Sequence, residues 1–256
     1  MEEIMQSNSF FIIPLTIAYL SICAMWFVIS AFGLSWPISV IKTPHKPWLE
    51  MGLALVTCVF VFLIGRLYSA GWLLPHTSNK VMNNTFWVVN NIIIYSPIFL
   101  FMLLRKQGLE TIFISNKCLV RKLSLGIVAS LLGVVLFSGI RDEWHHIPQI
   151  LSASVESKAL INFPAVFFEN VALAFLFVRL KWAVGIKWAI GVPSILFAFA
   201  HVPGSLAEGD PWNHIIIFFF LTGSLTTIIL YTAYRSRDII WLGVVHFVMD
   251  VVIKAF

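Results

Sequence analysis

The chain has 256 residues, of which 59% are hydrophobic and only 11% are charged. Soluble domains carry about 25% charged residues, so this composition excludes a soluble protein and indicates an integral membrane protein. The net charge of +5 is therefore assigned to loops beside a membrane and not to nucleic-acid binding.

Eight apolar stretches are long enough to cross a bilayer, because about 30 Å of hydrocarbon takes roughly 20 helical residues. In chain order they are Phe10–Leu34, Met51–Leu74, Phe86–Leu104, Leu123–Ile140, Leu160–Leu180, Val184–Val202, Ile215–Tyr234 and Ile239–Phe256, the last being the shortest. The sequence thus predicts an all-α, polytopic membrane protein with about eight transmembrane helices in one bundle. We expect a single membrane domain over residues 1–256, since no linker or repeat interrupts it.

The basic residues are distributed unevenly between the loops that alternate along the chain. One set of loops carries twelve lysines and arginines and the other set carries four. Cytoplasmic loops are enriched in basic residues, so the twelve are predicted to lie inside and both termini outside. One of the inner loops, residues 105–122, mixes apolar and basic positions. It is predicted either as an interfacial helix or as a plain basic loop.

Four ionisable residues stand inside otherwise apolar runs of the C-terminal half: Glu169, His201, His246 and Asp250. Such groups are costly in hydrocarbon, so they usually face a bundle interior and have a function there. A carboxylate near a histidine in a partly dry site can act as a general base on water. Further hydrogen-bond donors can stabilise an oxyanion. We expect these four side chains to line one polar cavity and to support hydrolysis of an amide.

Each residue also has a purely structural interpretation. Glu169 can bond to a neighbouring helix, and His201 can be interfacial because Pro203 and Gly204 follow it. His246 and Asp250 can form a structural pair, because residues four apart share one helix face.

The order of these residues resembles a known family. Glu169, then Phe197-Ala198-Phe199-Ala200-His201, then His246-Phe247-Val248-Met249-Asp250 resembles the motifs EExxxR, FxxxH and HxxxN/D of the CPBP family. That family contains the CAAX prenyl endopeptidases and bacterial bacteriocin-processing or immunity proteins. The resemblance covers about the C-terminal third, and residues 160–256 are expected to form the catalytic core helices.

The first motif departs from the family pattern. Glu169 is present, but Asn170 stands where the second Glu is expected and Ala174 where the Arg is expected. These positions are one helical turn apart. Losing both partners avoids leaving one buried charge uncompensated, which costs about 3–5 kcal/mol. The departure therefore indicates the concerted loss of an ion pair.

The resemblance implies a role for each residue. Glu169 and His201 activate a water, while His246 and Asp250 stabilise the oxyanion, and an Asp in that role must be protonated or act through another group. Asn170 and Phe197 are expected in the substrate pocket or in support of the catalytic groups. No cofactor is expected. The alternative within the family is a divalent metal such as zinc on the histidines and carboxylates.

Three functions are compatible with the sequence. The first is an intramembrane glutamate-dependent endopeptidase that cleaves a membrane-associated or lipidated peptide or protein. The second is a non-catalytic membrane scaffold or immunity protein, which the altered first motif favours. The third is an ion-coupled transporter, although the internal repeat that many transporters show is missing. The expected partners are a membrane-tethered peptide and the lipid bilayer, and the expected location is the bacterial plasma membrane, or the ER membrane in a eukaryote.

Arg66 is the one basic residue placed deep in a predicted span. At about eight residues below the outer end, it matches the expected depth of Glu169. We predict that Arg66 replaces the charge missing at position 174 by pairing with Glu169 or Asp250. The alternative is that its side chain extends outward to the headgroups.

Overall fold

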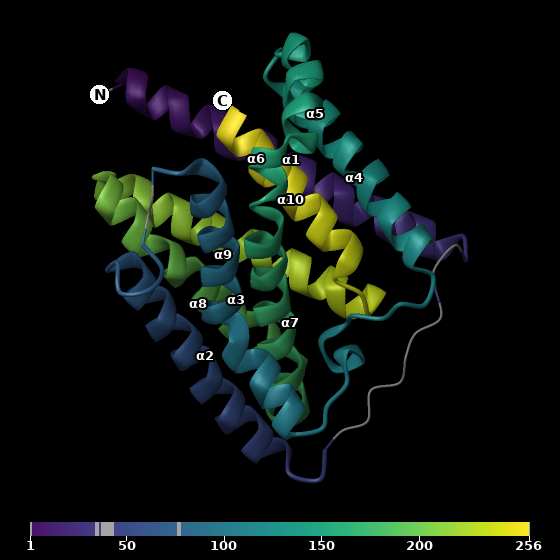
Figure 1. Cartoon of the computed structure of the whole chain (residues 1–256). Coiled ribbons are helices and arrows are strands. Elements are labelled where there is room, and N and C mark those ends of the chain that lie inside the picture. The colour runs from purple at the N-terminus through teal and green to yellow at the C-terminus, as the bar shows by residue number, and fades with distance from the viewer. Residues whose placement is uncertain (1, 34–35, 37–43, 76–77, 256) are drawn as a thin grey trace.

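A computed structural model describes residues 2–33, 36, 44–75 and 78–255, and the regular elements of these residues are all helical (Figure 1). The helices are α1 Glu2–Ala31, α2 Pro47–Ser69, α3 Lys80–Leu104, η1 Leu109–Ile112, α4 Leu119–Ile140, η2 Trp144–His146, α5 Ile147–Val155, α6 Ser157–Leu160, α7 Phe163–Val184, α8 Ile186–Glu208, α9 Trp212–Ser236 and α10 Ile240–Ala255.

Every predicted span corresponds to one of the long helices. Within the described residues, seven helical segments are long and apolar enough to cross a membrane, and α10 is an eighth apolar helix of 16 residues. The predicted all-α, polytopic membrane bundle is thereby confirmed. At 1.5 Å per residue α10 is only about 24 Å long, shorter than the ~30 Å hydrocarbon layer.

Helix α7 lies at the centre of the bundle and packs against α2, α3, α8, α9 and α10 (Figure 1). In its membrane-spanning window 44% of the residues are buried within the protein, compared with 17% in α2. The outer helices leave many large apolar side chains exposed, including Val56, Phe60 and Leu103. A bilayer is the solvent in which such surfaces are stable, so the chain is a multi-pass membrane protein.

Helices α1, α4 and α10 pack closely because α4 presents small residues to its neighbours. A Cβ atom on Gly126 would lie 2.8 Å from Val244 Cβ of α10, and one on Gly133 would lie 2.8 Å from Ile22 Cδ1 of α1. Ser130 lies between these glycines and donates to the Gly126 carbonyl, so its hydroxyl needs no partner outside the helix. Small residues on a helix face let backbones approach closely where no hydrophobic effect drives association.

The loop between α3 and α4 forms one 3₁₀ turn, η1, and not an interfacial helix. Ile112 and Phe113 are buried, and the Phe113 carbonyl accepts a hydrogen bond from the Ile239 N–H. The loop therefore folds inward beneath α7. The structure thus supports the loop alternative of the two that the sequence left open.

A buried polar network holds this loop against α2 and α7. Glu50 accepts hydrogen bonds from Arg105 Nε at 2.9 Å and from Gln107 Nε2 at 2.8 Å. The Gln107 carbonyl oxygen accepts from Arg179 Nη2, and Arg179 also donates to the Thr111 carbonyl at 3.0 Å. Glu50 and Arg179 are almost completely buried, so these hydrogen bonds within the protein take the place of hydration.

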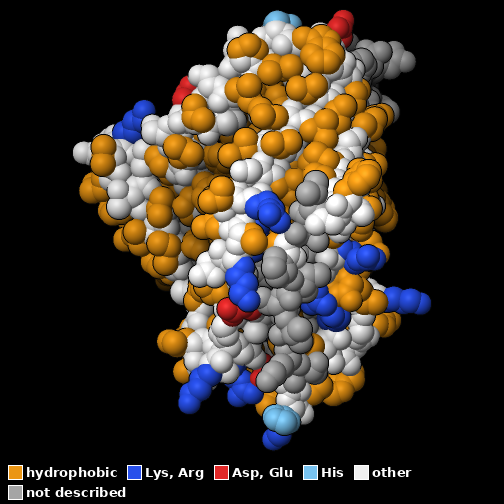
Figure 2. Space-filling model, turned by 90° about the vertical axis from the view of Figure 1, so that its right-hand side faces the viewer, with side chains coloured by type: hydrophobic (Ala, Val, Ile, Leu, Met, Phe, Trp, Pro, Cys, Tyr) orange, Lys and Arg blue, Asp and Glu red, His pale blue; other side chains and the backbone are white. Residues whose placement is uncertain are grey.

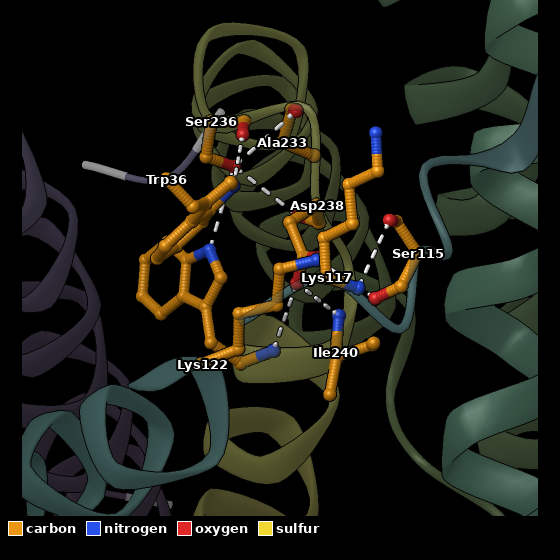
Figure 3. Close-up of polar contacts among 9 residues, drawn as sticks. Trp36, Ser115, Lys117, Lys122, Ala233, Ser236, Asp238 and Ile240 are labelled. Atoms are coloured by element: carbon orange, nitrogen blue, oxygen red, sulfur yellow. Dashed lines mark hydrogen bonds and ion pairs between the residues drawn. The ribbon is translucent and has the colours of Figure 1, made fainter. Parts of the chain in front are cut away.

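A second buried network anchors the start of α10 (Figure 3). Lys122 Nζ lies 2.5 Å from Asp238 Oδ2 and donates to the Ser115 carbonyl at 2.9 Å. Asp238 Oδ1 accepts from the Ile240 N–H at 2.7 Å, which caps the helix. This network holds α10 in place against α4.

The distribution of charge on the surface agrees with the predicted orientation, which stays a prediction. On the face shown in Figure 2, hydrophobic side chains cover the upper part and Lys and Arg side chains gather in the lower part. In Figure 1 the two chain ends lie in the upper part and the loop before α4 in the lower part.

Candidate active site

Helices α7 and α10 approach each other closely near the first and third motifs. A Cβ atom on Gly243 of α10 would lie 2.9 Å from Phe167 Cδ2 of α7, so any larger residue at 243 would have to displace that ring. Asn170 lies one turn after Phe167, and His246 comes three residues after Gly243. The missing side chain at position 243 therefore lets α7 and α10 pack closely near the two motif residues.

Asn170 contacts His246 directly. The Asn170 amide nitrogen lies 3.0 Å from His246 Nδ1, and it donates to the Val166 carbonyl at 2.8 Å. Asn170 is 5% exposed, while His246 is half-buried. The first and third motifs, 76 residues apart, are thus joined by a side-chain contact inside the bundle.

Two carboxylates of the predicted site share a neighbour on α1. The hydroxyl group of buried Tyr19 interacts electrostatically with both Glu169 and Asp250. Tyr95 of α3 also interacts with Glu169, and its ring packs against Phe168 with the centroids 5.6 Å apart. Residues of α1 and α3 therefore interact electrostatically with Glu169 of α7.

His201 lies on the neighbouring helix α8, as does Phe197, the first residue of the same motif. Its Nδ1 donates to the Phe197 carbonyl at 2.9 Å, and the two rings lie 4.5 Å apart. A carbonyl only accepts, so this contact puts the proton of the neutral ring on Nδ1 and leaves the Nε2 lone pair available. The convergence of His201 and Glu169 in one cavity stays a prediction.

Helix α8 continues through Pro203 to Glu208, beyond the predicted end at Val202. His201 is therefore seven residues, or about 10 Å, inside the helix and not at its end. Proline is tolerated in transmembrane helices because neighbouring groups can satisfy the freed carbonyl. The purely interfacial interpretation of His201 loses its main support, which was the expected helix end.

Position 174 carries an uncharged alanine that packs in the hydrophobic core. Ala174 is 1% exposed and belongs to the hydrophobic core around α7. With Asn170 in contact with His246, neither altered position of the first motif carries a charge. This arrangement agrees with the concerted loss of a buried ion pair.

The prediction that Arg66 replaces this missing charge by pairing with Glu169 or Asp250 is wrong. Helix α2 covers Pro47–Ser69, so it ends five residues before the predicted Leu74 and leaves Arg66 in its last turn. There the side chain is exposed, and among the ion pairs of the described residues none involves Arg66. The earlier helix end places Arg66 where its guanidinium can reach the headgroup layer, which is the cheaper position for a charge.

A cavity of about 220 Å³ lies at the upper ends of α2, α3 and α7. Its lining residues are Tyr68, Leu74, Pro75, Asn83, Asn84, Phe86, Trp87, Asn90, Lys158, Ile161 and Asn162. None of the residues predicted for the site lines this cavity. Asn162 is seven residues, or about 10 Å, from Glu169 along the chain.

The zinc alternative gains no support from the geometry. Within the described part of the chain, no three His, Cys, Asp or Glu side chains are grouped so that they could hold a metal ion. Structural and catalytic zinc sites use at least three protein ligands.

Tyr19 and Tyr95 were not predicted from the sequence. A signal was present for Tyr19, because tyrosines of membrane proteins concentrate at the interfaces and this one lies well inside the first span. A mid-span tyrosine needs a partner for its hydroxyl, as a mid-span glutamate does. No sequence pattern shows that Tyr19 interacts electrostatically with Glu169 and Asp250.

Residues 157–252 match the model of a family described as Type II CAAX prenyl endopeptidase Rce1-like. The match includes all three motifs, and it confirms the resemblance predicted from them. Comparison with curated proteins and with solved structures found no match. The family match supports a CAAX-type intramembrane endopeptidase in general terms.

Proposed function

We propose, from the match of residues 157–252 to the Rce1-like CAAX prenyl endopeptidase model, that this protein is a glutamate-dependent intramembrane endopeptidase. Its substrate is a membrane-associated or lipidated peptide or protein. The observation that carries the proposal is the contact between Asn170 and His246, because it brings the first and third motifs together beside Glu169.

Glu169 is the proposed general base. Its carboxylate takes a proton from a water molecule whose oxygen forms a bond with the carbonyl carbon of the scissile amide. When the carbon–nitrogen bond of the resulting tetrahedral intermediate breaks, Glu169 returns that proton to the leaving nitrogen. No covalent intermediate with the protein is formed, so the reaction needs no nucleophilic Ser or Cys.

His201 is the proposed partner of Glu169 in holding the water. Since its Nδ1–H is directed at the Phe197 carbonyl, Nε2 is the nitrogen that can accept a hydrogen bond from water. Phe197 therefore supports the site in two ways, because its ring packs on the imidazole and its carbonyl orients it.

His246 and Asp250 are proposed to stabilise the oxyanion. Asp250 accepts hydrogen bonds when ionised, so it needs a second group to present a donor to an oxyanion. The Tyr19 hydroxyl, which interacts with Asp250, is a group of the required kind. Preorganised donors of this sort contribute most when they are buried, as Tyr19 is.

The proposal is tested with purified protein in lipid nanodiscs and a quenched fluorescent, prenylated CAAX-type peptide. Glu169→Gln and His201→Ala are each expected to lower kcat by about 10²–10⁴-fold, the range for loss of a general base. Glu156→Gln is the matched control, because it neutralises an exposed carboxylate between α5 and α6 and is expected to cleave at the wild-type rate. Equal cleavage by wild type and Glu169→Gln would exclude the proposed mechanism.

The second candidate is a non-catalytic scaffold or immunity protein. It is favoured by one observation, the replacement of both the second Glu and the Arg of the first motif by Asn170 and Ala174. For this function the cellular phenotype would survive Glu169→Gln at unchanged expression. For the peptidase it would be lost.

A further inference from the structure

The orientation of the Asn170 amide is determined by its own helix. The amide nitrogen lies 2.8 Å from the Val166 carbonyl oxygen, and the residue is buried. Rotating the amide by 180° would place its oxygen against that carbonyl oxygen, two acceptors with no proton between them. The nitrogen must therefore face Val166, which also makes it the atom 3.0 Å from His246 Nδ1.

This orientation determines which nitrogen of His246 carries the proton. An amide NH₂ group has two hydrogens and only donates, so one hydrogen can go to the Val166 carbonyl and the other to His246. Nδ1 must then accept, which requires its lone pair. A neutral imidazole with an unprotonated Nδ1 carries its hydrogen on Nε2.

We infer that Asn170 is a positioning residue that holds His246 as the Nε2–H tautomer, so that His246 acts as a hydrogen-bond donor and not as a base. The oxyanion role of that donor rests on the proposed function, but the tautomer does not. A carboxylate at position 170, as in the EExxxR pattern, would accept from Nδ1–H. The neutral ring would then carry no proton on Nε2, and only the charged imidazolium would carry both. Asn170 therefore reverses the polarity of this contact.

The two motif histidines are thereby held in opposite states. In His201 a backbone carbonyl accepts from Nδ1–H and Nε2 is left as an acceptor, whereas in His246 an amide donates to Nδ1 and Nε2 is left as a donor. An acceptor suits the polarisation of a water, and a donor suits a developing oxyanion. The different roles of the two histidines therefore follow from their neighbours, the Phe197 carbonyl for His201 and the Asn170 amide for His246.

The test is nitrogen NMR on protein labelled with ¹⁵N-histidine in nanodiscs, with the His246 signals identified by their loss in His246→Ala. Wild-type protein is expected to show a neutral His246 ring protonated at Nε2. Asn170→Asp is expected to shift the proton to Nδ1. Asn170→Leu, which is nearly isosteric and remains informative if the new carboxylate prevents folding, is expected to give a mixture of both tautomers.

Asn91 provides the matched control. It is also a buried asparagine of a membrane helix, and its amide donates to the Trp87 carbonyl four residues back at 2.8 Å. Asn91→Asp and Asn91→Leu are expected to leave the His246 signals unchanged. If these variants moved the signals as much as the Asn170 variants do, the effect would be a general response to altered packing and the inference would be wrong.

A wild-type His246 protonated at Nδ1, or a tautomer unaffected by both Asn170 variants, would overturn the inference. The NMR result does not need a cleavable substrate, so the tautomer can be established even if the peptidase assay fails. With an active enzyme, Asn170→Asp is expected to lower kcat on the order of 10²–10³-fold with little change in KM. That is the effect of removing one oxyanion donor.

Discussion

Lys122 and Asp238 form an ion pair of 2.5 Å in which both side chains are almost completely buried. Lys122 lies in the first turn of α4, and Asp238 lies between α9 and α10, 116 residues later. Asp238 also caps α10 through the Ile240 and Trp241 N–H groups. The pair therefore fixes the start of the helix that carries His246 and Asp250.

Breaking this pair on one side is expected to destabilise the protein strongly. Lys122→Met leaves the Asp238 carboxylate buried without its counter-charge, which costs about 3–5 kcal/mol in the free energy of unfolding. The double variant Lys122→Met with Asp238→Asn is expected to recover most of this loss, because Asn keeps the cap without a charge. Unfolding in mixed detergent micelles, followed by circular dichroism, measures both. A double variant no more stable than Lys122→Met would contradict the prediction.

The raised pKa of Asp238 leads to a prediction of how the free energy of unfolding changes with pH. Burial raises the pKa of its carboxyl group, and the hydrogen bond from Lys122 opposes that shift only in part. The folded pKa then lies above the unfolded value of about 3.9, so the native state binds more protons than the unfolded chain between the two values. Stability is therefore expected to fall as the pH rises through this interval and to be level above it.

The measurement for this pH effect is the free energy of unfolding of wild type minus that of the Lys122→Met, Asp238→Asn double variant, in a pH series starting near the unfolded pKa. Taking the difference cancels contributions from the other carboxylates. Glu143 is one of these, with its pKa lowered by the hydrogen bond from Arg141, and it acts in the opposite direction. A difference that increases with pH would show that the sign is wrong.

The contact between α4 and α10 depends on the absence of a side chain at Gly126. A Cβ atom there would lie 2.8 Å from Val244 Cβ and 2.9 Å from the Trp241 carbonyl oxygen. Gly126→Ala is thus expected to lower stability by about 1–3 kcal/mol, the usual cost of overpacking. Gly52→Ala in α2 meets no atom within 4 Å and is expected to be neutral or slightly stabilising. Equal thermal stability of the two variants would argue against the close packing.

Gln107 bridges two buried charges, and its removal is expected to affect both. Its amide donates to Glu50, while its carbonyl oxygen accepts from Arg179. A hydrogen bond to a charged group contributes about 1.5–3 kcal/mol, so Gln107→Met is expected to be destabilising by at least that amount. Gln149→Met is the control, because Gln149 is exposed and its hydrogen bond is to the ring of half-buried His146 and not to a buried charge. A chemical denaturation series on both variants gives the comparison.

Much of the bundle could be predicted because membrane spans are local features of a sequence. A run of apolar residues of sufficient length becomes a helix in hydrocarbon, where every backbone group must find its partner within the segment. The ends of the spans were predicted less well, since apolar content continues past a helix end. For α2 this error moved Arg66 from the last turn to the middle of the membrane and produced a pairing that the structure does not contain.

The sequence alone determined that this is a helical membrane protein, and the order and spacing of Glu169, His201, His246 and Asp250 indicated the family whose model residues 157–252 match. Only the tertiary structure decided that Asn170 meets His246, that Tyr19 interacts electrostatically with two carboxylates and that Lys122 meets Asp238. These contacts join residues on different helices. They depend on which helix faces meet and on glycines such as Gly243 that let them approach, and helical periodicity within one segment carries no information about the partner.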